Sequence, residues 1–170
     1  LRLRSYGRAD REHPVFMELK KKYRSIVYKR RLTLPYGRAL DCLTGDCPWP
    51  ETQIGREIGY AMDFYPDLEP RVFLSYERDS WYAPESGLRI TFDDAIRFRT
   101  ADLTLDSDLW GTALLRPDQV LMELKAPGAI PLWMVRLLTE MGLYKTSFSK
   151  YGTAYQILLE QEYKGGKRYA

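Results

Sequence analysis

The chain is poor in the side chains on which metal and acid–base chemistry most often depends. Its 170 residues include one histidine, His13, and two cysteines, Cys42 and Cys47. A C-x4-C pair without further cysteine or histidine cannot complete a zinc site, so we expect a structural or incidental role for both cysteines. Long hydrophobic runs are also missing, since no stretch approaches the roughly 18 apolar residues of a membrane-spanning helix. A zinc centre and a helical membrane span are therefore excluded.

The charge balance is equally modest. Lys and Arg number 26 against 23 Asp and Glu, a net charge of +3, which is too small to indicate a nucleic-acid partner. The aromatic residues fall on strand faces rather than on an exposed basic platform, so we expect no nucleic-acid binding. The length and the 45% hydrophobic content fit one globular domain, and 14% aromatic residues favour a β-rich structure.

The alternation of side chains predicts mainly strands. A hairpin is expected over Val15 to Leu32, with its turn near Arg24 and Ser25. An acidic, exposed loop or a short hairpin is expected over 101–111. Further strands are predicted over 1–7, 71–82, 88–100 and 119–125, and helices over 38–43, 51–64, 131–143 and 151–162. In the third helix, Trp133, Leu137 and Met141 lie four residues apart and are expected to face the core.

Basic residues recur in the middle of these strands, where the other parity is apolar. They are Arg2, Arg4, Lys20, Lys29, Arg31, Arg78, Arg89 and Lys125. One such strand would leave a solvated basic face, but five or six strands closed into a barrel would line its interior with cations. Burying so many like charges is costly unless a polyanion fills the space, and phosphate chains suit Arg and Lys well. Glu18 and Glu123, each in a Glu-Leu-Lys sequence, offer oxygen ligands for Mg²⁺ or Mn²⁺.

Seven segments along the chain resemble the VTC domain, the polyphosphate polymerase module of the vacuolar transporter chaperone complex and its bacterial relatives. In order they read LRLRSYG, VFMELKKKY, VYKRRL, SYERDSWY, LRITFDD, LMELKAPG and YKTSFSKYG. The resemblance, which covers nearly the whole chain, places it in the triphosphate tunnel metalloenzyme superfamily, with the CYTH proteins. It implies an α+β fold, an antiparallel β-barrel tunnel with flanking helices, formed by residues 1–170 as one domain. It also implies transfer of the γ-phosphate of ATP to a growing polyphosphate chain, with Mn²⁺ or Mg²⁺.

Matching the family motifs residue by residue implies a set of roles. The catalytic positions are Arg2, Arg4, Lys20, Lys29, Arg78, Arg89 and Lys150. Arg31, Lys125 and Lys145 are expected to bind phosphate, and Glu123 and Glu18 to bind the metal. The nucleophile would be an ionised phosphate oxygen that needs no general base, so His13, in a turn, is not expected to act in catalysis.

The chain departs from the family pattern at two places. The family's opening strand, with alternating acidic residues and a lysine, does not appear before Leu1, so we expect either a segment upstream of the given sequence or a degenerate form of the domain. Ser147 stands where eukaryotic relatives have a lysine, and Lys145 is the expected substitute.

Two other functions use the same cations. An inorganic triphosphatase would pass the phosphoryl group to water, and a non-catalytic module would bind polyphosphate or inositol phosphate. The resemblance also allows a membrane-protein partner. We expect the protein to be cytoplasmic, either free or at the cytosolic face of a membrane.

Overall fold

The computed structural model describes residues 1–166. Every strand in it pairs with its neighbours in the antiparallel direction. Helices and antiparallel sheets occur together, which confirms the predicted α+β class. The chain divides into two units: unit 1 comprises Leu1–Arg71 and Leu103–Asp108, and unit 2 comprises Val72–Asp102 and the residues from Leu109 onward. Each unit has its own sheet.

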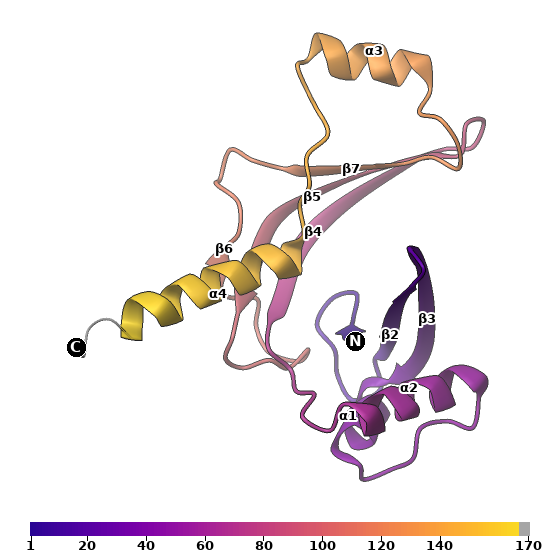
Figure 1. Ribbon diagram of the computed structural model, residues 1–170, viewed down its shortest axis with the longest axis vertical. Coiled ribbons are helices and arrows are strands. Elements are labelled where there is room, and N and C mark those ends of the chain that lie inside the picture. Colours follow the sequence, from indigo (N-terminus) through magenta and orange to yellow (C-terminus); the bar gives the residue numbers. More distant parts are fainter. Residues whose placement is uncertain (167–170) are drawn as a thin grey trace. The chain divides into compact units, whose positions relative to one another are not determined.

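The sheet of unit 1 has the strand order β1-β2-β3, with β1 at Arg2–Arg4, β2 at Pro14–Tyr23 and β3 at Ile26–Pro35. The long β2–β3 hairpin closes at Arg24 and Ser25, whose φ angles are 47° and 67°. Positive φ at both central residues is the geometry that two-residue hairpin turns prefer, because its twist matches that of the strands. The predicted hairpin and its turn are confirmed (Figure 1).

One face of this sheet packs on two helices, α1 at Tyr36–Thr44 and α2 at Gln53–Phe64. Because side chains alternate along a strand, Val15, Met17 and Leu19 all point to this face and are buried. From α2, Ile58 is fully buried against Met17 and Leu19. Glu18 and its basic neighbours have the opposite parity and lie on the other face.

The sheet of unit 2 is built around β5 at Leu88–Arg99. Along one edge β5 pairs with β4 at Phe73–Ala83. Along the other edge it pairs with two short strands, β6 at Thr112–Ala113 and β7 at Leu121–Lys125. The sequence predicted β4, β5 and β7 within a few residues, while β6 was not predicted.

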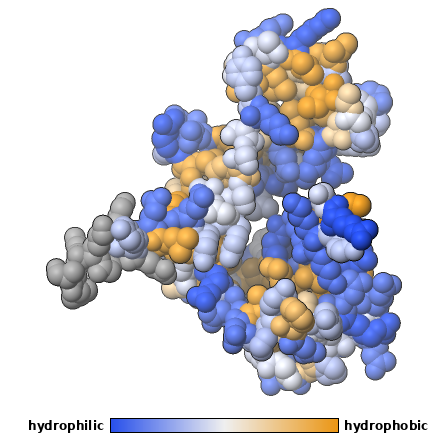
Figure 2. All heavy atoms as spheres, in the orientation of Figure 1, coloured by the Kyte–Doolittle hydropathy of each residue, from blue (hydrophilic) through white to orange (hydrophobic). Residues whose placement is uncertain are grey.

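Two helices complete unit 2, α3 at Leu132–Glu140 and α4 at Lys150–Gly166. The expectation that Trp133, Leu137 and Met141 face the core was wrong, since they are 55%, 43% and 62% exposed. In α3 the buried residue is Met134. Figure 2 shows hydrophobic atoms at the surface over α3. Four-residue spacing defines a stripe on a helix, but another element must cover that stripe before it becomes core.

Within residues 1–166 the strand pairings form these two sheets and do not close either one into a barrel. The predicted barrel therefore stays a prediction. None of the helices in this part of the chain has the length and apolar character needed to span a membrane.

Candidate functional site

A buried carboxylate gathers three cations on the polar face of the unit 1 sheet. Glu18 is only 1% exposed and lies directly opposite Arg2 on β1 and Arg31 on β3. Arg2 donates from Nε to Glu18 Oε2 at 2.9 Å, and Arg31 donates from Nη2 to Oε1 at 2.6 Å. Lys29 Nζ lies 2.8 Å from the same Oε1. We call these four residues the Glu18 cluster; its three cations and one carboxylate carry a formal charge of +2.

These contacts fix the charge state of Glu18. Burial alone would raise its pKa, but the hydrogen bonds from Lys29, Arg2 and Arg31 outweigh burial and lower the pKa to about 2. The carboxylate therefore stays ionised at neutral pH and holds the three cations side by side. Their side chains remain 39–47% exposed, so donors on the open side stay accessible to an anion.

Two further predicted cations, Lys20 and Arg4, share this face without a carboxylate. Lys20 lies directly opposite Lys29 on β3, and like charges in this position destabilise a sheet. In the described part of the chain, Lys20 has no ion-pair partner. Arg4 donates to the Tyr6 hydroxyl, and its buried Nε has no hydrogen-bond partner. An anion on this face would offset the repulsion and satisfy these donors.

Unit 2 repeats the arrangement around a second buried acid, Asp93, which is 0% exposed. Arg78, its direct neighbour across the β4–β5 pair, binds both carboxylate oxygens, at 2.5 Å from Nε and 2.6 Å from Nη2. Lys150, the first residue of α4, donates to Asp93 Oδ2. The ring of Tyr76 lies beneath both cations, with centroid distances of 5.2 Å to Arg78 Cζ and 4.6 Å to Lys150 Nζ. We call Asp93, Arg78 and Lys150 the Asp93 cluster.

Local sequence explains how Lys150 reaches this cluster. The hydroxyl of Ser149 accepts a hydrogen bond from the backbone N–H of Gly152 at 3.1 Å, which caps the start of α4. The Ser-Lys-Tyr motif therefore both starts the helix and sets Lys150 at its first turn. Although burial acts to raise the pKa of Asp93, hydrogen bonds from Arg78 and Lys150 lower it, and the bond to Asp93 raises the pKa of Arg78.

The sequence interpretation missed Asp93 and Tyr76. The available signal was parity, because Asp93 shares a strand face with Arg89 and Thr91. An acid at this position pairs with Arg78 only in the observed β4–β5 register, which the sequence does not state.

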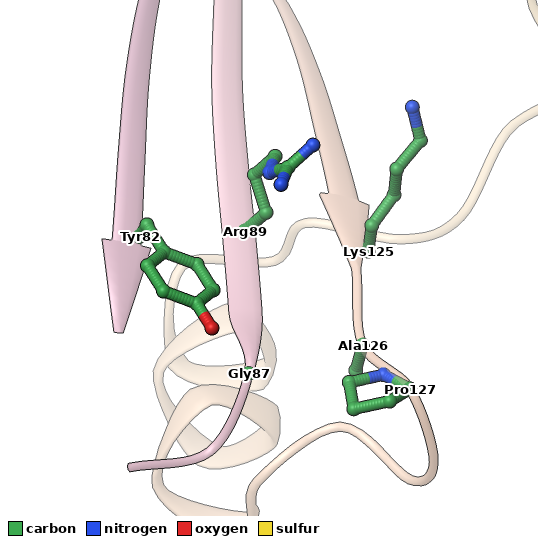
Figure 3. Close-up of a pocket in the computed structure, with 6 residues that line it drawn as sticks. All are labelled: Tyr82, Gly87, Arg89, Lys125, Ala126 and Pro127. Atoms are coloured by element: carbon green, nitrogen blue, oxygen red, sulfur yellow. The ribbon is translucent and has the colours of Figure 1, made fainter. Parts of the chain in front are cut away.

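A third group of predicted residues lies at the other end of the same sheet face. Lys125 on β7 is directly opposite Arg89 on β5, so two cations again face each other across a strand pair. They line a pocket of about 380 Å³ together with Tyr82, Gly87, Ala126 and Pro127, and Figure 3 shows Tyr82, Arg89 and Lys125 on three neighbouring strands. Arg89 has no carboxylate partner within residues 1–166. The pocket is therefore open and positively charged.

Glu123 lies between this pocket and the Asp93 cluster. Its Oε1 is 3.0 Å from Lys125 Nζ, its Oε2 is 4.0 Å from Arg78 Nη2, and its side chain is 44% exposed. The hydroxyl of Thr91, directly opposite Glu123 across the β5–β7 pair, is buried without a hydrogen-bond partner. Glu123 therefore has accessible oxygens beside an unsatisfied hydroxyl.

The two predicted metal ligands differ in what they can hold. Both oxygens of Glu18 already accept from cations, whereas Glu123 is accessible and has one close cation. In the part of the chain that the structure describes, no three acidic, histidine or cysteine side chains come together as a metal site. Mg²⁺ is often held by one or two carboxylates plus substrate phosphates, and Glu123 fits that pattern while Glu18 does not.

The remaining singled-out residues lie outside these clusters. Lys145 is exposed between α3 and α4 and forms no ion pair among residues 1–166. His13 lies in a turn, with Nε2 3.1 Å from the backbone oxygen of Tyr6. Cys42 and Cys47 have their sulfurs 2.9 Å apart at the end of α1, and burial with the Cys47 contact raises the pKa of Cys42 to about 11.

The lowered pKa of Glu18 predicts that the folded protein loses stability in acid. Its pKa is depressed from 4.5 to about 2 in the folded protein, so the unfolded chain takes up the proton first as the pH falls. The contribution of Glu18 is complete above about pH 4.5 and is lost as the pH falls toward 2. The depression corresponds to about 3 kcal/mol in the free energy of unfolding. Urea unfolding at pH 7, 4.5, 3 and 2 measures it, and an unfolding free energy that stays constant over this range would contradict the assignment.

Comparison with known proteins gives one result. The family model described as VTC domain matches residues 1–159. The chain matches no curated protein and no solved structure.

Proposed function

The chain belongs to the VTC domain family, and on this premise we propose that it is a polyphosphate polymerase that transfers the γ-phosphate of ATP to a growing polyphosphate chain. Family membership supports a polyphosphate-related function. The observation that carries the proposal is the pair of buried acids, Glu18 and Asp93, each holding two or three cations on one face of a sheet. Cations that faced only water could spread apart, and buried carboxylates such as Glu18 and Asp93 would not be needed to hold them side by side.

The cation face of unit 1 suits an extended phosphate chain. Guanidinium groups bind phosphoryl oxygens in pairs, and lysine adds a point charge, so the Glu18 cluster with Lys20 and Arg4 offers several contacts along the chain. No base is needed to activate the nucleophile, because the terminal phosphate oxygen is already ionised.

The cations of unit 2 suit the phosphoryl group in transfer. Arg78 and Lys150 are fixed by Asp93, and preorganised donors stabilise charge that develops on equatorial oxygens without rearrangement during the reaction. Arg89 and Lys125 supply a second positive position at the pocket, where a neighbouring phosphate would bind.

We propose Glu123 as the protein ligand of Mn²⁺ or Mg²⁺. A metal bound there would neutralise phosphate oxygens and orient them for in-line displacement. Lys125 would hold the second oxygen of Glu123, and Thr91 offers an unsatisfied hydroxyl beside it. The closed tunnel barrel, formed as one domain, also belongs to this proposal, as do the cytoplasmic location and a membrane-protein partner.

The proposal is tested by incubating the protein with ATP and Mn²⁺ and staining a gel for polyphosphate. We expect a ladder of long chains, which Arg78→Ala abolishes and Arg116→Ala, a change at an exposed arginine outside the clusters, leaves intact. Free phosphate without a ladder would identify a triphosphatase. Neither product, with polyphosphate or inositol phosphate still bound, would identify a binding module. Either result would overturn the polymerase.

A further inference from the structure

The free end of the β2–β3 hairpin combines exposed apolar side chains with exposed cations. We define the hairpin tip as residues 22–28. Tyr23, Ile26 and Val27 are 61%, 57% and 61% exposed, and Tyr28 is 41% exposed. Figure 2 shows hydrophobic atoms beside strongly hydrophilic ones at this end of the hairpin. Within unit 1 no core residue covers these side chains.

The tip also carries positive charge and no acid. Lys22 and Arg24 are exposed, and the guanidinium of Arg24 lies 5.2 Å from the centroid of the Tyr23 ring. Lys21, just before the tip, is already paired with Glu57 of α2 at 3.2 Å. The cations of the tip therefore remain available for an external anion.

The backbone of the tip is hydrogen-bonded on its inner side and open on its outer edges. The β2–β3 ladder continues to the last pair, Tyr23 opposite Ile26, so the strand edges that face each other are hydrogen-bonded up to the turn. The outer edges of both strands are unpaired at the tip among the described residues, since β1 pairs only with Phe16, Met17 and Glu18 and β3 is the edge of its sheet. The side chains of the tip can therefore enter an apolar layer while its backbone stays in a polar, hydrated one.

We propose that the hairpin tip docks on an anionic lipid bilayer surface. Inorganic polyphosphate would explain Lys22 and Arg24, but it has no apolar surface to cover Ile26 and Val27. A bilayer supplies both, because aliphatic and tyrosine side chains enter the headgroup region while cations bind anionic headgroups. This inference does not depend on the proposed polymerase activity.

Vesicle sedimentation tests the proposal. The full chain is mixed with phosphatidylcholine vesicles with and without 30% phosphatidylserine. We expect binding to the anionic vesicles only. Lys22→Ser/Arg24→Ser should weaken it about twenty-fivefold, because each basic residue near an anionic surface contributes about fivefold. Ile26→Ser/Val27→Ser should weaken it about tenfold or more, through lost burial of aliphatic groups.

Two control variants each replace one exposed residue of the same chemical type elsewhere with serine. Arg116→Ser and Leu109→Ser, at residues that are 72% and 68% exposed, should leave vesicle binding unchanged. Equal binding to neutral vesicles, or no binding to either, would overturn the proposal. So would a tip variant that loses polyphosphate affinity and keeps vesicle binding, since the tip would then bind the polyanion. If the wild-type protein binds anionic vesicles but does not turn over ATP, the result counts against the proposed polymerase and leaves the membrane docking standing.

Discussion

Replacing Glu18 with glutamine will lower the free energy of unfolding by about 3 kcal/mol at pH 7. Removing one partner of a buried charge pair typically costs about 3–5 kcal/mol. Here the three cations are 39–47% exposed and can turn toward water, which places the effect at the lower end. Glutamine keeps the shape of the side chain, so the loss reports charge rather than packing. Urea unfolding at pH 7 measures it.

Glu57 provides the matched control for this change. It also contacts two cations, Lys21 and Arg30, each at 3.2 Å, but on the helix-covered side of the sheet and in reach of solvent. Glu57→Gln should therefore lower stability much less. Tripolyphosphate should narrow the difference between wild type and Glu18→Gln, because an added anion replaces the missing counter-charge. A Glu18→Gln protein as stable as wild type would show that the cluster does not depend on its carboxylate.

The strands and the polar face of each sheet could be predicted because a strand has a period of two. Residues two apart on a strand lie on the same face, so the pattern placed Lys20 on the face of Glu18, and Lys29 on the face of Arg31. The role of Glu18 could not be predicted in the same way. The sequence shows an acid in a basic strand, but only the register places Arg2 and Arg31 directly across from it.

The errors share this origin. Asp93 was missed because its partner Arg78 comes from another strand and Lys150 from a distant helix. In α3, the spacing of Trp133 and Leu137 defined a stripe correctly, but whether a stripe is buried depends on elements elsewhere in the chain. Contacts between distant segments are the information that local periodicity lacks.

Glu123→Gln will reduce metal-dependent turnover by at least about a hundredfold while leaving polyphosphate affinity at or slightly above that of wild type. Glutamine retains the size of the side chain and removes the charge on which a divalent ion depends, and a bound metal ion contributes several kcal/mol to transition-state stabilisation. Affinity should not fall, because the change also releases Lys125, whose Nζ lies 3.0 Å from Glu123. ATP turnover and polyphosphate binding, measured on the same preparation, separate the two effects.

Glu77 on β4 offers the control, since it is an exposed glutamate of the same sheet outside the clusters. Glu77→Gln should leave both turnover and affinity unchanged. Mn²⁺ binding, followed by electron paramagnetic resonance in the presence of tripolyphosphate, gives a readout that does not require turnover, and it should weaken only in Glu123→Gln. If Glu123→Gln turned over ATP within a few-fold of wild type, the metal would have to be held by substrate oxygens without Glu123. The buried hydroxyl of Thr91 would then need another partner, and the cations fixed by Asp93 would account for most of the catalysis.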